Sequence, residues 1–146
     1  MTDDIHGQFE AISLAAASVQ ELHLELIRRS QHNNFDGEQV CADLLAHRGD
    51  WQAVLFDTNA LTGGGGMSGL IKLRDMADNF YNVDTLYILA VDEAAAHRLA
   101  ALAEPWLADD VQLYNQRNTN LHLGGCDDNP SASSGRRLRL VTMWWD

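Results

Sequence analysis

Four consecutive glycines, Gly63–Gly66, separate a short apolar run from a segment with helical spacing. Together with Gly69 they satisfy the pattern G-x-G-x-x-G, whose glycines let backbone amides approach a pyrophosphate at the start of a helix. In the dinucleotide-binding fingerprint the first glycine ends the strand, whereas here "DTNALT" (57–62) intervenes. The pattern is not a P-loop either, because no Gly-Lys-Ser/Thr follows. A phosphate site and a turn both remain open, and the turn is the favoured interpretation.

Two aspartates follow the two strongest strand patterns. Asp57 comes after "QAVLF" (52–56), and Asp92 comes after "TLYILAV" (85–91). If these strands are parallel neighbours, both carboxylates lie at the same edge of the sheet, where open α/β folds bind ligands. Carboxylates are also ligands that Mg²⁺ prefers. The sequence therefore allows a nucleotide or Mg²⁺ site, hydrolytic or not, with Asp57 and Asp92 as metal ligands. Its residues would be Asp57, Asn59, Gly64, Gly66, Ser68 and Asp92.

Each of these acids also has a structural interpretation. Asp92 is well placed as the N-cap of the helix that follows it, and Asp57 can close an Asx-turn. The words "LFDTNAL" (55–61) are similar to the first motif of PIN-type nucleases. That resemblance implies that Asp57 is the first metal acid, supported by Thr58 and Asn59. In that family the strand opens the domain, whereas here residues 1–54 precede it and no later acid completes the pattern.

The sequence predicts no covalent catalysis. Ser68 lacks the Gly-x-Ser-x-Gly arrangement of a nucleophile elbow. Cys41 falls on the apolar face of a helical pattern, and Cys126 has no metal-type spacing to it, so we expect two reduced cysteines. We therefore expect a binding protein without a cofactor rather than an enzyme.

Charge is the most unusual property of the chain. Ten Lys and Arg stand against 21 Asp and Glu, which gives a net charge of −11. Such a surface repels nucleic acids and anionic membranes, and it attracts basic partners. The predicted function is a small acidic binding protein, of the immunity or antitoxin type, that masks a basic protein such as a nuclease toxin. Solubility alone is the competing explanation of the charge. The candidate contacts are Asp109, Asp110, Asp127 and Asp128, with Trp106 or Trp145 as an aromatic anchor.

The first half of the chain has helical spacing. Apolar residues recur at steps of three and four across 5–30, which predicts one long helix in which Glu25 pairs with Arg29. Asp36 is placed to cap a second helix, with Gln39 three residues later.

The second half alternates strands and helices. The strands at 52–56 and 85–91, with a helix between them, indicate a right-handed βαβ unit with parallel strands. A third helix follows Asp92 and ends at Pro105. Three more strands are predicted at "DVQLYN" (110–115), "NLHL" (120–123) and "RLRLVTMWW" (137–145), and residues 124–137 predict a mobile loop.

The predicted fold class is α/β, with residues 1–146 forming a single domain. It has a mixed sheet with the βαβ unit, antiparallel C-terminal strands and a long N-terminal helix packed on one face. A homo-oligomer joined through that helix or through the last strand is a further possibility. The chain starts without a secretory signal and has no apolar run of the roughly 20 residues that span a bilayer, so we expect a cytoplasmic protein.

Overall fold

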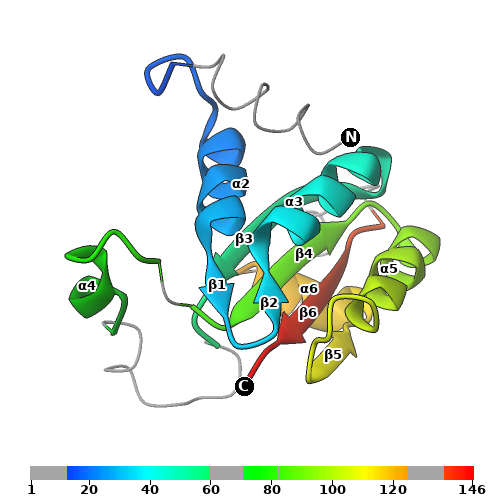
Figure 1. Cartoon of the computed structure of the whole chain (residues 1–146). Helices are drawn as coiled ribbons and strands as arrows, with labels where there is room; N and C mark the ends of the chain where they lie inside the picture. Colours follow the sequence, from blue (N-terminus) through cyan, green and yellow to red (C-terminus); the bar gives the residue numbers. More distant parts are fainter. Residues whose placement is uncertain (1–12, 60–70, 82, 125–136) are drawn as a thin grey trace.

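The computed structural model describes residues 13–59, 71–81, 83–124 and 137–146, and it has the predicted α/β architecture. Four strands form the main sheet in the order β3-β4-β6-β5, and each neighbouring pair is antiparallel (Figure 1). A small hairpin, β1-β2, lies apart from it. The strands are β1 (Gln31–His32), β2 (Phe35–Asp36), β3 (Trp51–Asp57), β4 (Thr85–Ala90), β5 (Asp110–Leu113) and β6 (Arg139–Trp144).

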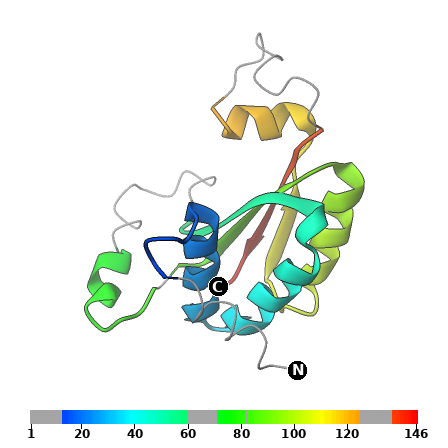
Figure 2. The same ribbon diagram turned by 90° about the horizontal axis from the view of Figure 1, so that it is seen from above.

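Helices cover the sheet unevenly. Figure 2 shows α2, α3 and α5 on one face, while α6 lies on the other face at one end. The helices are α2 (Val19–Arg29), α3 (Gly37–Ala46), α4 (Ile71–Met76), α5 (Glu93–Ala100) and α6 (Gln116–His122), with short 3-10 turns η1 (Arg48–Asp50) and η3 (Ala101–Ala103). None of the described helices has the length and apolar character needed to cross a bilayer.

The predicted N-terminal helix is confirmed from Val19 onward, and it packs on β3. It begins later than the spacing suggested, because Ser18 forms a capping box with Glu21: the Ser18 hydroxyl accepts from the Glu21 amide, and the Glu21 carboxylate accepts from the Ser18 amide. The part of the prediction before residue 13 lies outside the described residues.

The predicted parallel βαβ unit is wrong, and so is the mixed sheet. β3 and β4 are antiparallel, with Trp51 opposite Ala90 and Asp57 opposite Thr85. A parallel connection must carry the chain back across the sheet under a covering helix. The only described helix between these strands, α4, instead lies beside the sheet, where its Leu73 and Met76 are exposed (Figure 1).

Another predicted strand is a helix. Residues 120–123 were expected to be extended, but α6 occupies Gln116–His122. Its start is fixed by Asn115, whose side-chain oxygen accepts from the Asn118 amide. The antiparallel strands at 110–115 and 137–145 are confirmed in outline as β5 and β6. The loop predicted at 124–137 falls mainly outside the described residues.

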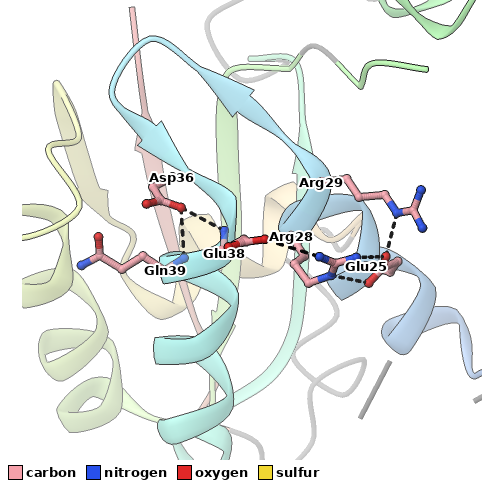
Figure 3. A network of polar contacts seen from close by, with 6 residues as sticks. All are labelled: Glu25, Arg28, Arg29, Asp36, Glu38 and Gln39. Atoms are coloured by element: carbon pink, nitrogen blue, oxygen red, sulfur yellow. Dashed lines mark hydrogen bonds and ion pairs between the residues drawn. The ribbon is translucent and has the colours of Figure 1, made fainter. Parts of the chain in front are cut away.

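An ion pair between Arg28 and Glu38, at 3.6 Å, joins the end of α2 to the start of α3 (Figure 3). Glu25 pairs with Arg28 at 2.5 Å and with Arg29 at 2.7 Å, as its spacing to Arg29 predicts. Burial tends to raise the pKa of the Glu25 carboxyl, but hydrogen bonds from the two guanidinium groups outweigh it and lower that pKa. The Asp36 carboxylate accepts from the amides of Glu38 and Gln39, which confirms the predicted helix cap.

Gly37 lets the two helices approach closely. A Cβ at this position would lie 2.0 Å from the Ile27 carbonyl oxygen and 2.5 Å from that of Ser30. Both are backbone atoms, so a side chain cannot be accommodated by a rotamer change. Gly49, in the turn after α3, has no atom within 4 Å of the same position.

Replacing Gly37 with alanine should therefore destabilise the protein. We expect Gly37→Ala to lower the free energy of unfolding by about 2 kcal/mol or more, because the α2–α3 contact must open. Urea denaturation followed by circular dichroism measures this, and Gly49→Ala, expected to change stability by less than about 1 kcal/mol, is the matched control. Equal stabilities of the two variants would contradict the close approach.

Candidate functional site

The antiparallel topology gathers carboxylates at one end of the main sheet. The starts of β4 and β5 and the ends of β3 and β6 meet there, because Asp57 lies opposite Thr85, which in turn lies opposite Trp144. Backbone contacts extend the group: the Trp145 amide donates to the Asp84 carbonyl, and the Asp146 amide donates to the Asp109 carboxylate. We call this group the acidic end. It comprises Asp57, Asp84, Asp109, Asp110 and Asp146.

Only one of these acids has a basic partner among the described residues. Lys72 donates to the Asp57 carboxylate at 2.6 Å, and this hydrogen bond raises the pKa of Lys72. Within the described ranges, no Lys, Arg or His pairs with the other four carboxylates. Four uncompensated negative charges therefore lie close together at a partly solvated surface, which attracts cations.

A hollow of about 490 Å³ lies beside the acidic end. It is on the face of the sheet opposite α2, α3 and α5, since its residues on β4, β5 and β6 are cross-strand partners on that face. Along β5 and the residue after it, the Tyr114 hydroxyl donates to the side-chain oxygen of Gln112, and the side-chain amide of Gln112 donates to the Asp110 carboxylate at 3.0 Å. The hollow is lined by Asn59, Thr85, Asp110, Gln112, Tyr114, Thr142 and Trp144.

The lining suits one kind of chemical group. A carboxylate beside two aromatic rings can bind a Lys or Arg side chain, through a charge-assisted hydrogen bond and through the face of a ring. The sequence analysis placed Asp110 at a partner surface and Asn59 at a ligand site, and the structure brings both to this hollow.

Asp57 and Asp92 do not share a metal site. Asp92 lies beyond Ala90, at the other end of β4 from Thr85, so about 17 Å of strand separates the two ends. Its carboxylate accepts from the Ala95 amide at 2.7 Å and caps α5. Asp57 instead accepts from the Thr58 amide and from Lys72. Among the described residues, no three His, Cys, Asp or Glu side chains form a group that could hold a metal ion.

The two tryptophans predicted as partner anchors are in the core. Trp106 is 2% exposed and Trp145 is fully buried, so neither presents a ring to a partner. The Trp145 indole donates to the Trp106 carbonyl, and the Trp106 indole donates to Asp43. Trp145 also packs edge-on against Phe35, at 4.8 Å between ring centroids. These contacts account for both indole N–H groups and hold the rings inside.

Some of the other predicted positions lie within the residues that the structure describes, and others lie outside them. The last strand, β6, has strands on both sides, so its edges cannot join two copies of the chain. Cys41 is buried and free, and its burial raises the pKa of the thiol to about 11, which makes it a poor nucleophile. The remaining site residues fall outside the described residues: Gly64, Gly66, Ser68, Asp127 and Asp128.

The sequence analysis missed the residues that shape the hollow. Gln112 and Tyr114 alternate with Asp110 in "DVQLYN", and this spacing alone puts all three on one face of a strand. Trp144 and Trp145 are adjacent in "RLRLVTMWW", so their rings lie on opposite faces of the strand, and which of the two is buried depends on where the helices pack. No signal in the sequence pairs Thr85 with Trp144.

The opposite end of the sheet has mixed charge. Arg98 contacts both carboxylate oxygens of Asp50, with a shortest distance of 2.6 Å, and His47 lies 3.1 Å from the same carboxylate. The hydrogen bond from Arg98, together with that from His47, lowers the pKa of Asp50 to about 2. Among the described residues, Asp50 is thus paired with basic side chains, unlike Asp84, Asp109, Asp110 and Asp146 of the acidic end.

A comparison with models of protein families, with curated proteins and with solved structures finds no match for this chain.

The Asp50–Arg98 pair should make stability depend on pH in the acid range. The folded-state pKa of about 2 lies below the value of about 3.9 in an unfolded chain, so the pair stabilises the fold above pH 4. This contribution is lost as the pH falls toward 2. We expect Asp50→Asn to be less stable than the unmodified protein at pH 7, by up to about 1 kcal/mol because Arg98 is exposed.

Urea unfolding at pH 7, 4 and 3 tests this expectation. The difference between the two proteins should shrink as the pH falls from 4 to 3. Asp78→Asn, at an exposed position, controls for the loss of one negative charge. A difference that stays constant over this range would show that the pair does not titrate as described.

Proposed function

We propose that this protein binds a basic protein partner through the acidic end of its sheet. The observation that carries the proposal is the coincidence of two features: four carboxylates without a described basic partner, and an adjoining hollow lined by Asp110, Tyr114 and Trp144. A Lys or Arg side chain of the partner enters the hollow, and the surrounding aspartates contact further basic groups.

The charge distribution suits this role. Complementary charge raises association rates and discriminates against wrong partners more than it raises affinity. The hollow supplies the localised contact that charge alone lacks, because Tyr and Trp are enriched among the residues that carry binding energy. The interaction weakens as salt is added, since the carboxylates are exposed.

The biological form we propose is an immunity or antitoxin-type inhibitor that masks a basic protein such as a nuclease toxin in the cytoplasm. Clustered carboxylates can occupy the positions that nucleic-acid phosphates take in a basic groove. The net charge of −11 supports this form, because it disfavours nucleic acid itself as the ligand.

A charge-reversal pair tests the proposal. Asp110→Lys and Glu93→Lys make the same change in net charge, but only Asp110 lies at the acidic end. We expect oligolysine to bind the unmodified protein at low salt, and Asp110→Lys to weaken this binding about tenfold, which corresponds to about 1.4 kcal/mol. Glu93→Lys should weaken it less than about threefold.

Isothermal titration calorimetry gives the affinities, and thermal melting confirms that both variants are folded. Equal weakening by the two variants would show that oligolysine senses only the net charge, and the acidic end would then not be the binding site. Absence of binding to the unmodified protein would remove the proposal.

A further inference from the structure

The two edges of the main sheet differ. On the outer edge of β3, the Gln20 side chain pairs with the Val54 backbone in both directions: its amide donates to the Val54 carbonyl at 3.0 Å, and its oxygen accepts from the Val54 N–H at 2.9 Å. The Tyr81 hydroxyl donates to the Phe56 carbonyl on the same edge. Side chains thus occupy the positions that another strand would take, and they close this edge.

The outer edge of β5 has no such cover among the described residues. All four residues of β5, Asp110–Leu113, are exposed. The Tyr114 backbone amide donates to the Leu140 carbonyl of β6. Along an antiparallel strand, the backbone groups of successive residues point alternately toward one neighbour and away from it. The N–H and C=O groups of Val111 and Leu113 are therefore directed away from β6. No described group bonds to them.

The side chains of β5 offer two different surfaces to an incoming strand. Asp110 and Gln112 face the hollow, as cross-strand partners of Trp144 and Thr142. Val111 and Leu113 point to the helix-covered face, where they stay 37% and 42% exposed. A strand added at this edge places alternate residues beside the carboxylate and beside the apolar pair, since side chains alternate with a period of two.

We propose that β5 is the docking edge for an extended segment of the basic partner, which adds to the sheet as a further strand. The segment alternates basic and apolar residues: the basic side chains lie toward Asp110 and the hollow, and the apolar ones contact Val111 and Leu113. This inference rests on the proposed function and specifies how the partner binds, through main-chain hydrogen bonds as well as through charge.

Charge complementarity selects this occupant over a second copy of the chain. Two copies that met edge to edge would bring together molecules that each carry a net charge of −11, with Asp109 and Asp110 of each copy beside the end of the other copy's β5. Like charges disfavour that contact, whereas a basic strand relieves them.

The probe for this proposal is a short peptide of alternating lysine and valine, blocked at both ends. Two further peptides are N-methylated at every other residue. In one, the methyl groups lie on the lysines, and in the other on the valines, so that each peptide has one edge that cannot donate main-chain hydrogen bonds. A fourth peptide has the same composition with the lysines and valines in separate blocks. We expect the alternating peptide to bind. The block peptide should bind at least tenfold more weakly, and so should the N-methylated peptide whose methyl groups lie on the edge that meets β5, whereas the peptide methylated in the other phase should bind normally.

Hydrogen exchange measured by NMR locates the contact. Binding should slow exchange of the Val111 and Leu113 amides, while the Gln112 amide, directed toward β6, changes little. Val111→Pro removes the outward N–H and leaves the β5–β6 ladder intact, so it should abolish binding of the alternating peptide with little change in the melting temperature. The N-methylated peptides keep the test decisive if this variant fails to fold.

The outcomes separate this inference from the proposed function. If N-methylation has no effect, if exchange at Val111 and Leu113 is unchanged, and if Asp110→Lys still weakens binding, strand addition is wrong and the acidic end alone binds the cation. If neither oligolysine nor the alternating peptide binds, both proposals are wrong. A dimer that protects the same two amides without peptide would show that the occupant is a second copy, which also overturns the inference.

Discussion

The central position of β6 is the constraint on which the rest of the fold depends. The strand β6 lies between β4 and β5, and among the described residues it is the sheet partner of β5. Forming these pairs requires closure of long loops, which costs chain entropy before any contact is gained. That cost is offset in the core, where Val141, Met143 and Trp145 are fully buried beneath the helices. The strand β6, together with Trp145 just after it, therefore holds together segments that are far apart in the sequence.

Placing β6 antiparallel to both neighbours has an electrostatic consequence. The ends of β3 and β6 and the starts of β4 and β5 come together, and each contributes an aspartate. Like charges this close repel one another, so the arrangement does not help folding. The backbone before β5 adds a further cost, because Leu107 has φ of 56°, in the left-handed region. It is tolerated where the Ala108 amide reaches back to the Ala103 carbonyl and turns the chain into β5. Both costs fall at the same end of the sheet.

Local features could be predicted from the sequence, whereas strand partners could not. The caps at Asp36 and Asp92 and the Glu25–Arg29 pair depend on residues within four positions of one another, and all three predictions are confirmed. The error about Asp57 and Asp92 followed from the direction of one strand. A helix in the connection between two strands is compatible with parallel and with antiparallel strands. A parallel connection requires the helix to pack on the sheet, and none of the α4 side chains that the structure describes belongs to the core there. Burial of Trp106 and Trp145 depends likewise on β6 entering the sheet beside β4, which no local spacing indicates.

The two edges of the main sheet differ, because side chains cover the outer edge of β3 but not that of β5 among the described residues. The Gln20 side chain on α2 bonds to both the N–H and the C=O of Val54, as a neighbouring strand would. No helix of the described chain does the same for Val111 and Leu113, although α5 packs close to β5. An open edge with exposed apolar side chains invites association with other strands. The aspartates at the start of β5 and the negative charge of the whole molecule restrict that association, because they repel further copies of the chain. In the complex that we propose, charge selects the partner, and the open edge supplies the directional hydrogen bonds that charge lacks.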